Sequence, residues 1–413
     1  MSFSLESLLN IPGVEVFQTE ILEKEISIHV KIKSNYTRCH QCGQKATEFH
    51  CDGEVVRLRH LPIFERRVYL YLHTKRYRCL NCDNGPTTTQ HEDWYDLDAH
   101  CTKAYAKFLM REMVGTTLAD VARKHGVAYG ILRGLLMRLV EDRVDWRKHR
   151  RLTVLGLDEI SLLKGHGDFV TIVSTRDEDG HPVILAVLEG REKETVKSFL
   201  QTIPRKLQAT IKQVCVDMYE GFANAVKEVL PQALIVADRF HVAKGYRAAL
   251  DELRKTEMRE LKKSLPPKEF EGLKGVMWAL RRNQEDLTDE EMRLLELLFE
   301  CSPALHEAYR LREQLTGIFE SPHTKASAER ALRQWIEEVK KSGLTCFDKF
   351  LGTLENWMDE IANYFLDRLS SGWVEGFNNK IKVIKRRSYG LSVPANLFRR
   401  IWLDLNGLEA FAY

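Results

Sequence analysis

The sequence lacks an apolar run of about eighteen residues, the length that a helix needs to cross a bilayer, so no segment predicts a membrane span. Its beginning, MSFSLESLLNIPGVEVFQTE, carries acidic residues and no basic region ahead of an apolar stretch, which argues against a secretory signal. Internal repeats and low-complexity tracts are also absent, which argues against a repeat protein. We therefore expect a protein that stays in the cytosol.

The formal net charge is small, +3 over 413 residues, and by itself identifies no partner. Hydrophobic residues make up 44% of the chain and charged residues 29%, as in soluble globular proteins, and the length predicts about two to four domains. The stretch from Gly376 to Leu403 has no acidic residue but seven basic ones: Lys380, Lys382, Lys385, Arg386, Arg387, Arg399 and Arg400. It predicts a phosphate-contacting surface, with a solvated helix face as the alternative.

Four of the nine cysteines form two C-x-x-C motifs, Cys39–Cys42 and Cys79–Cys82. The two-residue gap lets both thiolates of a motif bind one ion, and two motifs supply the four sulfurs of a closed tetrahedral zinc site. Because such a site leaves no position open for water, the zinc would be structural. Buried or redox-active cysteines are the alternative. The other five cysteines are expected to be small residues of the hydrophobic core: Cys51, Cys101, Cys215, Cys301 and Cys346.

The segment that follows the cysteine motifs predicts three helices, over 104–114, 117–125 and 128–140. Thr117 is a suitable N-cap for the second helix, and Gly126 can adopt the left-handed conformation that ends it. This arrangement is typical of a helix-turn-helix that binds DNA, although helical hairpins without such a role are common. The third helix would present Tyr129, Arg133 and Arg138 to DNA.

The central region predicts a mixed sheet in which three strands end on an acid: Thr153–Asp158, Lys212–Asp217 and Ala233–Asp238. Side chains at the carboxyl ends of adjacent parallel strands converge on one crevice. Carboxylates gathered there repel one another, and magnesium or manganese relieves that repulsion through oxygen ligands. Two such ions can hold the attacking and leaving oxygens of an in-line phosphoryl displacement. For any one of these aspartates, helix capping is the alternative.

Four segments of the sequence resemble one family. LDEISLLKG (157–165), CVDMYEGF (215–222), VADRFHV (236–242) and SSGWVEGFNNKIKVIKRRSYG (370–390) are similar to the ISL-three group of bacterial insertion-sequence transposases. That group belongs to the DDE superfamily, whose catalytic core is RNase H-like. The resemblance covers essentially the whole chain, and its last segment is the most specific.

The resemblance implies that Asp158, Asp217 and Glu375 are the three catalytic acids, which hold two magnesium or manganese ions. Glu375 lies near the start of an expected helix over 373–387, with Asn378, Lys382 and Arg386 on or beside its face. Lys382 stands where many such enzymes place a basic residue. An ordinary amphipathic basic helix is the alternative for this segment.

Three further residues are candidates to support the metal ligands rather than to bind metal themselves: Asp238, His241 and Glu159. Asp238 ends the strand beside that of Asp217 and could replace it as a ligand, or belong to a structural network; we favour Asp217. Glu159 should point to the opposite side of its strand from Asp158.

The residues expected to contact double-stranded DNA, at the transposon ends and at the target, are Tyr129, Arg133, Arg138, Lys380, Lys382, Lys385, Arg386 and Arg387. The helical stretch between the strand that ends at Asp238 and the helix of Glu375 is interpreted as an insertion. It either contacts DNA or serves for packing or dimerisation. We expect a homodimer, at least on DNA, in the bacterial cytoplasm and associated with the nucleoid.

The sequence thus predicts a multidomain fold that combines α/β and all-α parts. The expected domains are a zinc-ribbon-like β-rich module over 1–100, a helix-turn-helix over 101–147, the first part of an RNase H-like core over 148–243, a helical insertion over 244–369, and the second part of the core with basic helices over 370–413. The expected function is metal-dependent DNA cleavage and strand transfer at terminal inverted repeats. An inactive DNA-binding regulator and an RNase H-like nuclease are the alternatives.

Overall fold

The computed structural model describes residues 5–162, 169–368, 372–388 and 393–412, with the side chain of Glu375 excepted. The chain forms two compact units. The first unit comprises Met1–Asp142, Ile384–Leu391 and Arg399–Tyr413, and the second comprises Arg143–Val383 and Ser392–Phe398. The five domains expected from the sequence remain a prediction.

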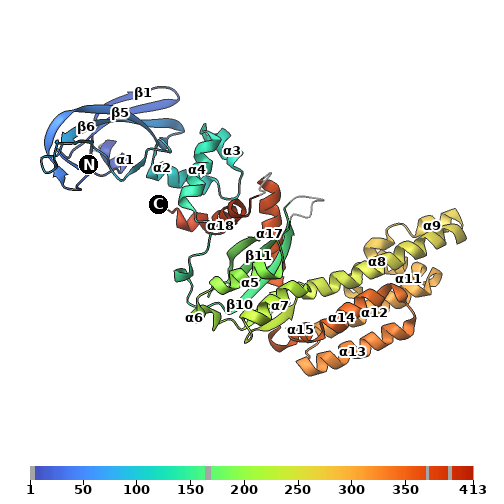
Figure 1. The fold of residues 1–413 in the computed structure, drawn as a ribbon. Helices are drawn as coiled ribbons and strands as arrows, with labels where there is room; N and C mark the ends of the chain where they lie inside the picture. Colours follow the sequence, from blue (N-terminus) through green and yellow to red (C-terminus); the bar gives the residue numbers. More distant parts are fainter. Residues whose placement is uncertain (1–4, 163–168, 369–371, 389–392, 413) are drawn as a thin grey trace. The chain divides into compact units, whose positions relative to one another are not determined.

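The first unit begins with a mixed β-sheet (Figure 1). Its strand order is β1-β2-β6-β5-β9-β8, and β7 pairs with β6. Apolar residues alternate along its long strands, so that Ile28 of β2 and Leu70 of β6 are fully buried on one face. The elements are α1 (Leu5–Leu9), β1 (Val14–Ile21), β2 (Glu25–Ile32), β5 (Glu48–Ile63), β6 (Arg66–Arg78), β7 (Thr87–Thr89), β8 (Tyr95–Asp96) and β9 (Cys101–Thr102), with a small ribbon of β3 (Thr37–Arg38) and β4 (Lys45–Ala46).

Three helices follow within two residues of the expected bounds: α2 (Lys103–Glu112), α3 (Leu118–His125) and α4 (Tyr129–Leu139). The side chain of Thr117 caps α3 by accepting from the amide of Asp120, and Gly126 ends the helix at a φ of 60°. These are the caps that the sequence predicts. Helix α18 (Pro394–Ala410) contributes Leu403 to the hydrophobic core of these helices.

The second unit contains a mixed sheet in the order β12-β11-β10-β13-β14. Strands β10, β11 and β12 pair antiparallel, whereas β13 and β14 run parallel to β10, as in an RNase H-like core. The fold class expected from the sequence is therefore confirmed. The elements are η1 (Trp146–Lys148), β10 (Val154–Ser161), β11 (Phe169–Arg176), β12 (Pro182–Glu189), α5 (Lys193–Thr202), α6 (Arg205–Gln208), β13 (Gln213–Val216), α7 (Glu220–Val229) and β14 (Leu234–Ala237).

One expected strand end is wrong. Strand β10 does not stop at Asp158 but runs on to Ser161, because β11 continues to pair with it as far as Phe169. Strands β13 and β14, in contrast, end directly before Asp217 and Asp238. Asp158 therefore lies within a strand whose parallel neighbour has just ended, which leaves that side of its backbone open.

A helical segment separates β14 from the last part of the core, as the sequence predicts. It begins with α8 (Arg239–Ser264), which continues directly from the sheet (Figure 1). Its apolar residues belong to the same hydrophobic core as the sheet, and the amide of Asn363 donates to the carbonyl of Ile235 in β14 at 2.9 Å. The other helices are α9 (Pro267–Gly272), α10 (Val276–Ala279), η2 (Gln284–Asp286), α11 (Asp289–Cys301), α12 (Pro303–Glu320), α13 (Lys325–Ser342), η3 (Thr345–Phe347), α14 (Asp348–Asn356), α15 (Met358–Ala362), α16 (Tyr364–Asp367) and α17 (Gly372–Arg387). None of the helices in the described ranges is long and apolar enough to cross a membrane.

Candidate active site

Strand register brings the first two predicted acids together. Leu157 of β10 pairs with Val216 of β13, so Asp158 and Asp217 occupy the next position on adjacent parallel strands. The first turn of α8 adds His241 to this pair. One ligand atom from each of the three side chains lies within 4.8 Å of the other two. The two carboxylates of this group are suited to hold a magnesium or manganese ion, because those ions prefer oxygen ligands.

Burial and mutual repulsion disfavour the charged forms of both acids. Burial raises the pKa of Asp158. Burial, together with the charge of Asp158, raises the pKa of Asp217 to about 7. The Oδ1 atom of Asp217 is buried and has no hydrogen-bond partner among the residues that the structure describes. A divalent cation would relieve the repulsion and satisfy that oxygen, so these residues fit a bound metal.

Two donors orient the carboxylate of Asp158. The backbone amide of Glu159 donates to its Oδ1 at 2.8 Å. The side-chain amide of Asn378, from α17, donates to its Oδ2. Asn378 is 2% exposed, and its own Oδ1 has no partner in the described structure. The sequence placed Asn378 on the helical face of Glu375 but did not identify it as a contact of Asp158.

Asp238 caps helix α8. Its Oδ1 accepts from the amide of Phe240 at 2.8 Å, and its Oδ2 lies 3.2 Å from Nδ1 of His241. The hydrogen bond to Asp238 raises the pKa of His241, which favours the protonated ring. Both oxygens of Asp238 thus have partners, one in the helix cap and one at His241. The preference for Asp217 as the metal ligand remains a prediction.

Glu159 is held away from Asp158 by an arginine. Its Oε2 accepts from Nη1 of Arg191 at 2.8 Å. The Arg191 guanidinium lies 5.0 Å from the ring centre of Phe169 and 5.1 Å from that of Tyr219. Glu159 therefore positions Arg191 over two aromatic rings beside the acids, a contact that the sequence did not indicate.

Glu375 lies in the first turn of α17, and its side chain is outside the described part of the structure. Its neighbours are anchored to the sheet. A Cβ atom at Gly156 of β10 would lie 2.9 Å from Cγ2 of Val374, so glycine permits the close approach of α17. The ring of Trp373 lies 5.1 Å from the guanidinium of Arg176. These contacts, with that of Asn378, hold the backbone around Glu375 against β10.

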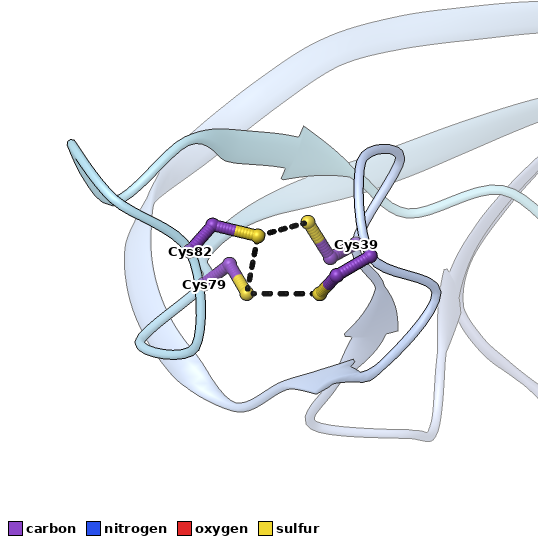
Figure 2. Close-up of side chains that lie close together, drawn as sticks. Cys39, Cys79 and Cys82 are labelled. Atoms are coloured by element: carbon purple, nitrogen blue, oxygen red, sulfur yellow. Dashed lines mark hydrogen bonds between the residues drawn. The ribbon is translucent and has the colours of Figure 1, made fainter.

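The four cysteines of the two motifs converge in the first unit (Figure 2). Sulfur–sulfur distances are 3.9 Å for Cys39 and Cys82, 3.6 Å for Cys42 and Cys79, and 3.8 Å for Cys79 and Cys82. Backbone hydrogen bonds from Cys42 and Gln41 lower the pKa of Cys39 to about 6, which favours the thiolate. The four sulfurs fit a tetrahedral zinc ion.

Two family models match the chain. One, described as the transposase of the ISL3 group with a DDE core, matches residues 155–401. The other, described as the zinc finger of the transposases of IS204, IS1001, IS1096 and IS1165, matches residues 35–82. The chain belongs to the ISL3 family of DDE transposases. Membership implies a divalent metal and agrees with structural zinc at the cysteines.

The transposase is similar to known proteins over most of its length. It is 30% identical over 406 residues to the transposase of IS1001 from Bordetella parapertussis, which covers 96% of each chain. It is 26% identical over 392 residues to the transposase of IS1557 from Mycobacterium tuberculosis, which covers 90% of this chain and 86% of that protein. Among solved structures, it is similar to the Drosophila P element transposase strand transfer complex, with 12% identity, a TM-score of 0.41, and coverage of 74% of this chain and 92% of that one.

The residues expected to contact DNA differ in how the transposase uses them. Tyr129 is 55% exposed, and Arg133 is exposed on the same helix. Arg138, in contrast, donates to Asp96 at 3.0 Å, and Arg387 forms an ion pair with Asp404. DNA binding by these side chains remains a prediction. For Arg138 and Arg387, a contact with DNA would compete with the ion pair that each forms with an aspartate of the protein.

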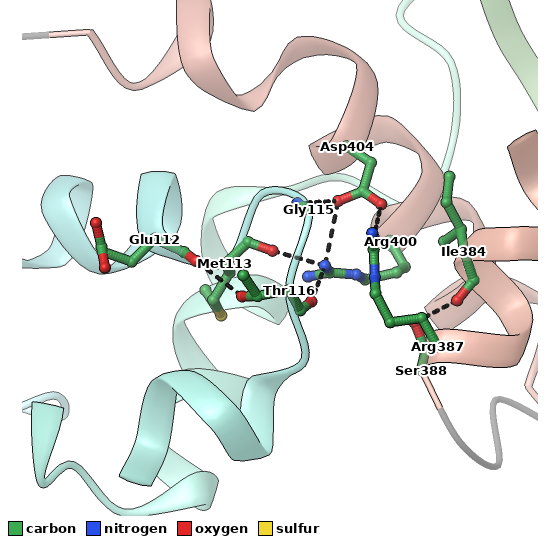
Figure 3. Close-up of polar contacts among 9 residues, drawn as sticks. All are labelled: Glu112, Met113, Gly115, Thr116, Ile384, Arg387, Ser388, Arg400 and Asp404. Carbon is green, nitrogen blue, oxygen red and sulfur yellow. Dashed lines mark hydrogen bonds and ion pairs between the residues drawn. The ribbon is translucent and has the colours of Figure 1, made fainter. Parts of the chain in front are cut away.

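A buried ionic network in the first unit uses part of the basic stretch (Figure 3). Arg400 is 1% exposed and donates to the carbonyls of Met113 and Thr116 and, at 3.1 Å, to Asp404. The backbone amide of Gly115 donates to the same carboxylate at 3.0 Å.

Outside this network, Arg399 pairs with Asp142 at 2.9 Å. Arg387, Arg399 and Arg400 of the basic stretch thus make structural contacts. Phosphate contact by the stretch, including Lys380, Lys382, Lys385 and Arg386, remains a prediction.

Proposed function

We propose that this transposase binds the terminal inverted repeats of its insertion sequence and catalyses divalent-metal-dependent cleavage and transfer of the DNA strand. The observation that carries the proposal is the convergence of Asp158, within β10, and Asp217, directly after the end of β13. Among the described residues, one buried oxygen of Asp217 has no partner. Carboxylates placed in this way are suited to hold cations for phosphoryl transfer.

Asp158, Asp217 and Glu375 would hold two magnesium or manganese ions. Bound there, the metal would supply Lewis-acid stabilisation of the attacking and leaving oxygens in an in-line displacement. Glu375 is assigned as the third metal ligand because it lies in the segment 370–390 that resembles the family.

The reaction has two displacements. In the first, water attacks the phosphorus at the transposon end, and the bond to the 3′ oxygen breaks. In the second, the freed 3′-hydroxyl attacks the phosphorus of a phosphodiester in the target DNA, and the bond from that phosphorus to the target's own 3′ oxygen breaks, which leaves a 3′-hydroxyl on the target strand. No covalent bond between protein and DNA is required.

The surrounding side chains would orient and protonate the reacting groups. Asn378 and the backbone of Glu159 hold both oxygens of Asp158, so the carboxylate is preorganised. Asp238 fixes the ring of His241 and favours its protonated form. A protonated ring here can give its proton to the leaving 3′ oxygen during cleavage.

The DNA contacts would come from the helix-turn-helix, through Tyr129, Arg133 and Arg138, and from the basic part of α17. The partners are double-stranded DNA and a second copy of the chain, at least on DNA, in the bacterial cytoplasm and nucleoid. The apolar residues of the helical insertion belong to the same hydrophobic core as the sheet, which favours a role in packing over a contact with DNA.

A cleavage assay tests the proposal. A supercoiled plasmid that carries the element is incubated with the transposase and magnesium, beside the same plasmid without the element ends. We expect nicking at the ends only, which Asp158→Ala or Glu375→Gln abolishes while end binding persists.

The alternatives give other patterns in the same assay. Binding of the ends without nicking by the wild type would support an inactive regulator and overturn the proposal. Equal nicking of both plasmids would support a nuclease.

A further inference from the structure

One face of the N-terminal sheet carries aromatic and basic side chains in rows across its strands. Along β2 and β6 the residues alternate between buried and partly exposed, so one face packs on the core and the other faces outward. On the outward side, the strand pairing places His29 beside Tyr71 and Tyr71 beside Arg57. The next row places Tyr69 beside Arg59. We call this surface the outer sheet face and define it by Lys31, Arg57, Arg59, Arg67, Tyr69 and Tyr71.

Positive charge dominates the outer sheet face. Lys31 lies 3.1 Å from Glu15, and Arg57 lies 3.8 Å from Glu25 with its side chain 52% exposed. Arg59 is held by a neutral group instead: its Nη1 donates to the hydroxyl of Tyr69 at 2.9 Å, and its buried Nε has no partner in the described structure. An anion at this face would therefore meet the Arg59 guanidinium, which pairs with no acid in the described structure, and the largely exposed guanidinium of Arg57.

The aromatic rings on this face hold the cations in place. The guanidinium of Arg57 lies 3.7 Å from the ring centre of Tyr69. His29 stacks on Tyr71 with ring centres 4.9 Å apart and an interplanar angle of 13°. Because neighbouring side chains cover these ring faces, the surface is poorly suited to stacking unpaired bases. It is suited to presenting fixed positive charge to a phosphate backbone.

The outer sheet face is continuous with the helix-turn-helix of the same unit. A Cβ atom at Gly126, where α3 ends, would lie 3.0 Å from Nη2 of Arg67. The guanidinium of Arg59 lies 5.4 Å from the ring centre of Tyr105 in α2, and that ring stacks on Phe108 at 5.8 Å. DNA bound by the helix-turn-helix would thus meet the arginines of the sheet directly beside its turn.

We propose that the outer sheet face binds the phosphate backbone of duplex DNA adjacent to the helix-turn-helix. This inference rests on the proposed function, since it assumes that the first unit binds DNA. The sheet contributes affinity that does not depend on sequence, because phosphates carry no base identity. It also extends the bound duplex beyond the segment that the recognition helix can reach.

The test compares DNA binding by the full-length protein and by the double variant Arg57→Gln/Arg67→Gln. The probes are a short labelled duplex of mixed sequence and its single strand, titrated over a range of salt concentrations. Two lost phosphate contacts should weaken duplex binding on the order of tenfold at low salt and reduce the salt dependence by roughly two counterions. The matched control is Arg205→Gln/Lys206→Gln, an equal charge change on exposed residues of α6, which should bind as the wild type does.

Further measurements keep folding separate from binding. Arg57→Lys/Arg67→Lys should restore most of the affinity, because the charge is kept. In the wild type, duplex DNA should protect Lys31 of the outer sheet face from amine labelling while Lys206 stays reactive. Unchanged duplex binding by the glutamine variant, a loss confined to the single strand, or labelling of Lys31 that DNA does not reduce would each overturn the inference. These outcomes do not depend on plasmid cleavage, so they are distinguishable from a failure of the proposed function.

Discussion

The side-chain amide of Asn378, on α17, donates a hydrogen bond to the carboxylate of Asp158, on β10, although 220 residues separate them in the chain. This contact joins the helix that carries Glu375 to the strand that carries the first acid. It therefore links two of the three predicted metal ligands through one buried amide.

Replacing Asn378 with alanine should lower strand cleavage by at least tenfold. The variant loses the donor that orients Asp158, and an unsatisfied buried carboxylate oxygen costs about 1–3 kcal/mol of stability. Removal of the donor also raises the pKa of Asp158, so the acidic limb of the pH–rate profile should move to higher pH. The control is Asn379→Ala, an exposed neighbour on the same helix. Equal pH profiles for both variants would show that Asn378 serves only for packing.

The stability of the metal-free protein should fall as pH rises through the range in which Asp217 ionises. The folded-state pKa is about 7, whereas the ordinary value is 3.8. The stability contributed by this group is full below about pH 4 and is lost as the pH rises through about 7. Asp217→Asn should therefore melt at a higher temperature than the wild type at pH 8, with the difference much smaller at pH 4. The measurement is thermal unfolding in buffer without divalent cations, and a difference independent of pH would contradict the assignment.

Replacing Asp238 with asparagine should reduce cleavage without abolishing it. Asparagine still caps α8, but it removes the negative charge that raises the pKa of His241. The basic limb of the pH–rate profile should therefore shift to lower pH. Complete loss of cleavage by a protein with unchanged melting temperature would show instead that Asp238 is itself a metal ligand.

Replacing a cysteine of the two C-x-x-C motifs should release the zinc ion and lower the thermal stability of the first unit. Cys79→Ser should release zinc and lower the melting temperature of the first unit, because a structural metal contributes directly to folding. Cys301→Ser, at an exposed cysteine outside the motifs, should change neither property. The checks are zinc content by metal analysis and unfolding by calorimetry. Normal zinc content in Cys79→Ser would rule out its role as a ligand.

Replacing Arg400 with methionine should destabilise the first unit by about 3–5 kcal/mol. The change removes a buried donor from the carboxylate of Asp404 and from two backbone carbonyls. Figure 3 shows Arg400 among these polar partners. Lys380→Met, at an exposed position of α17, should change the free energy of unfolding by less than about 0.5 kcal/mol. Similar denaturant midpoints for the two variants would contradict the structural role of Arg400.

Local spacing in the sequence was sufficient for several features. The two-residue gaps between Cys39 and Cys42 and between Cys79 and Cys82 predict a zinc site, and the four sulfurs converge. Thr117 and Gly126 predict the bounds of α3 through their capping preferences. Such features depend on residues near one another in the chain, so the sequence alone determines them.

Tertiary structure decided which of the acids meet and what supports them. The alignment of β10 with β13 brings Asp158 and Asp217 together, and the start of α8 adds His241 and commits Asp238 to a helix cap. Long-range packing likewise removes Arg400 from the expected DNA surface and buries it.

The sequence thus determined the elements, the zinc motif and the family of this transposase. The order of the strands and the seating of α8 and α17 decided the partners of its acids, because contacts between residues far apart in the chain follow from packing rather than from local pattern.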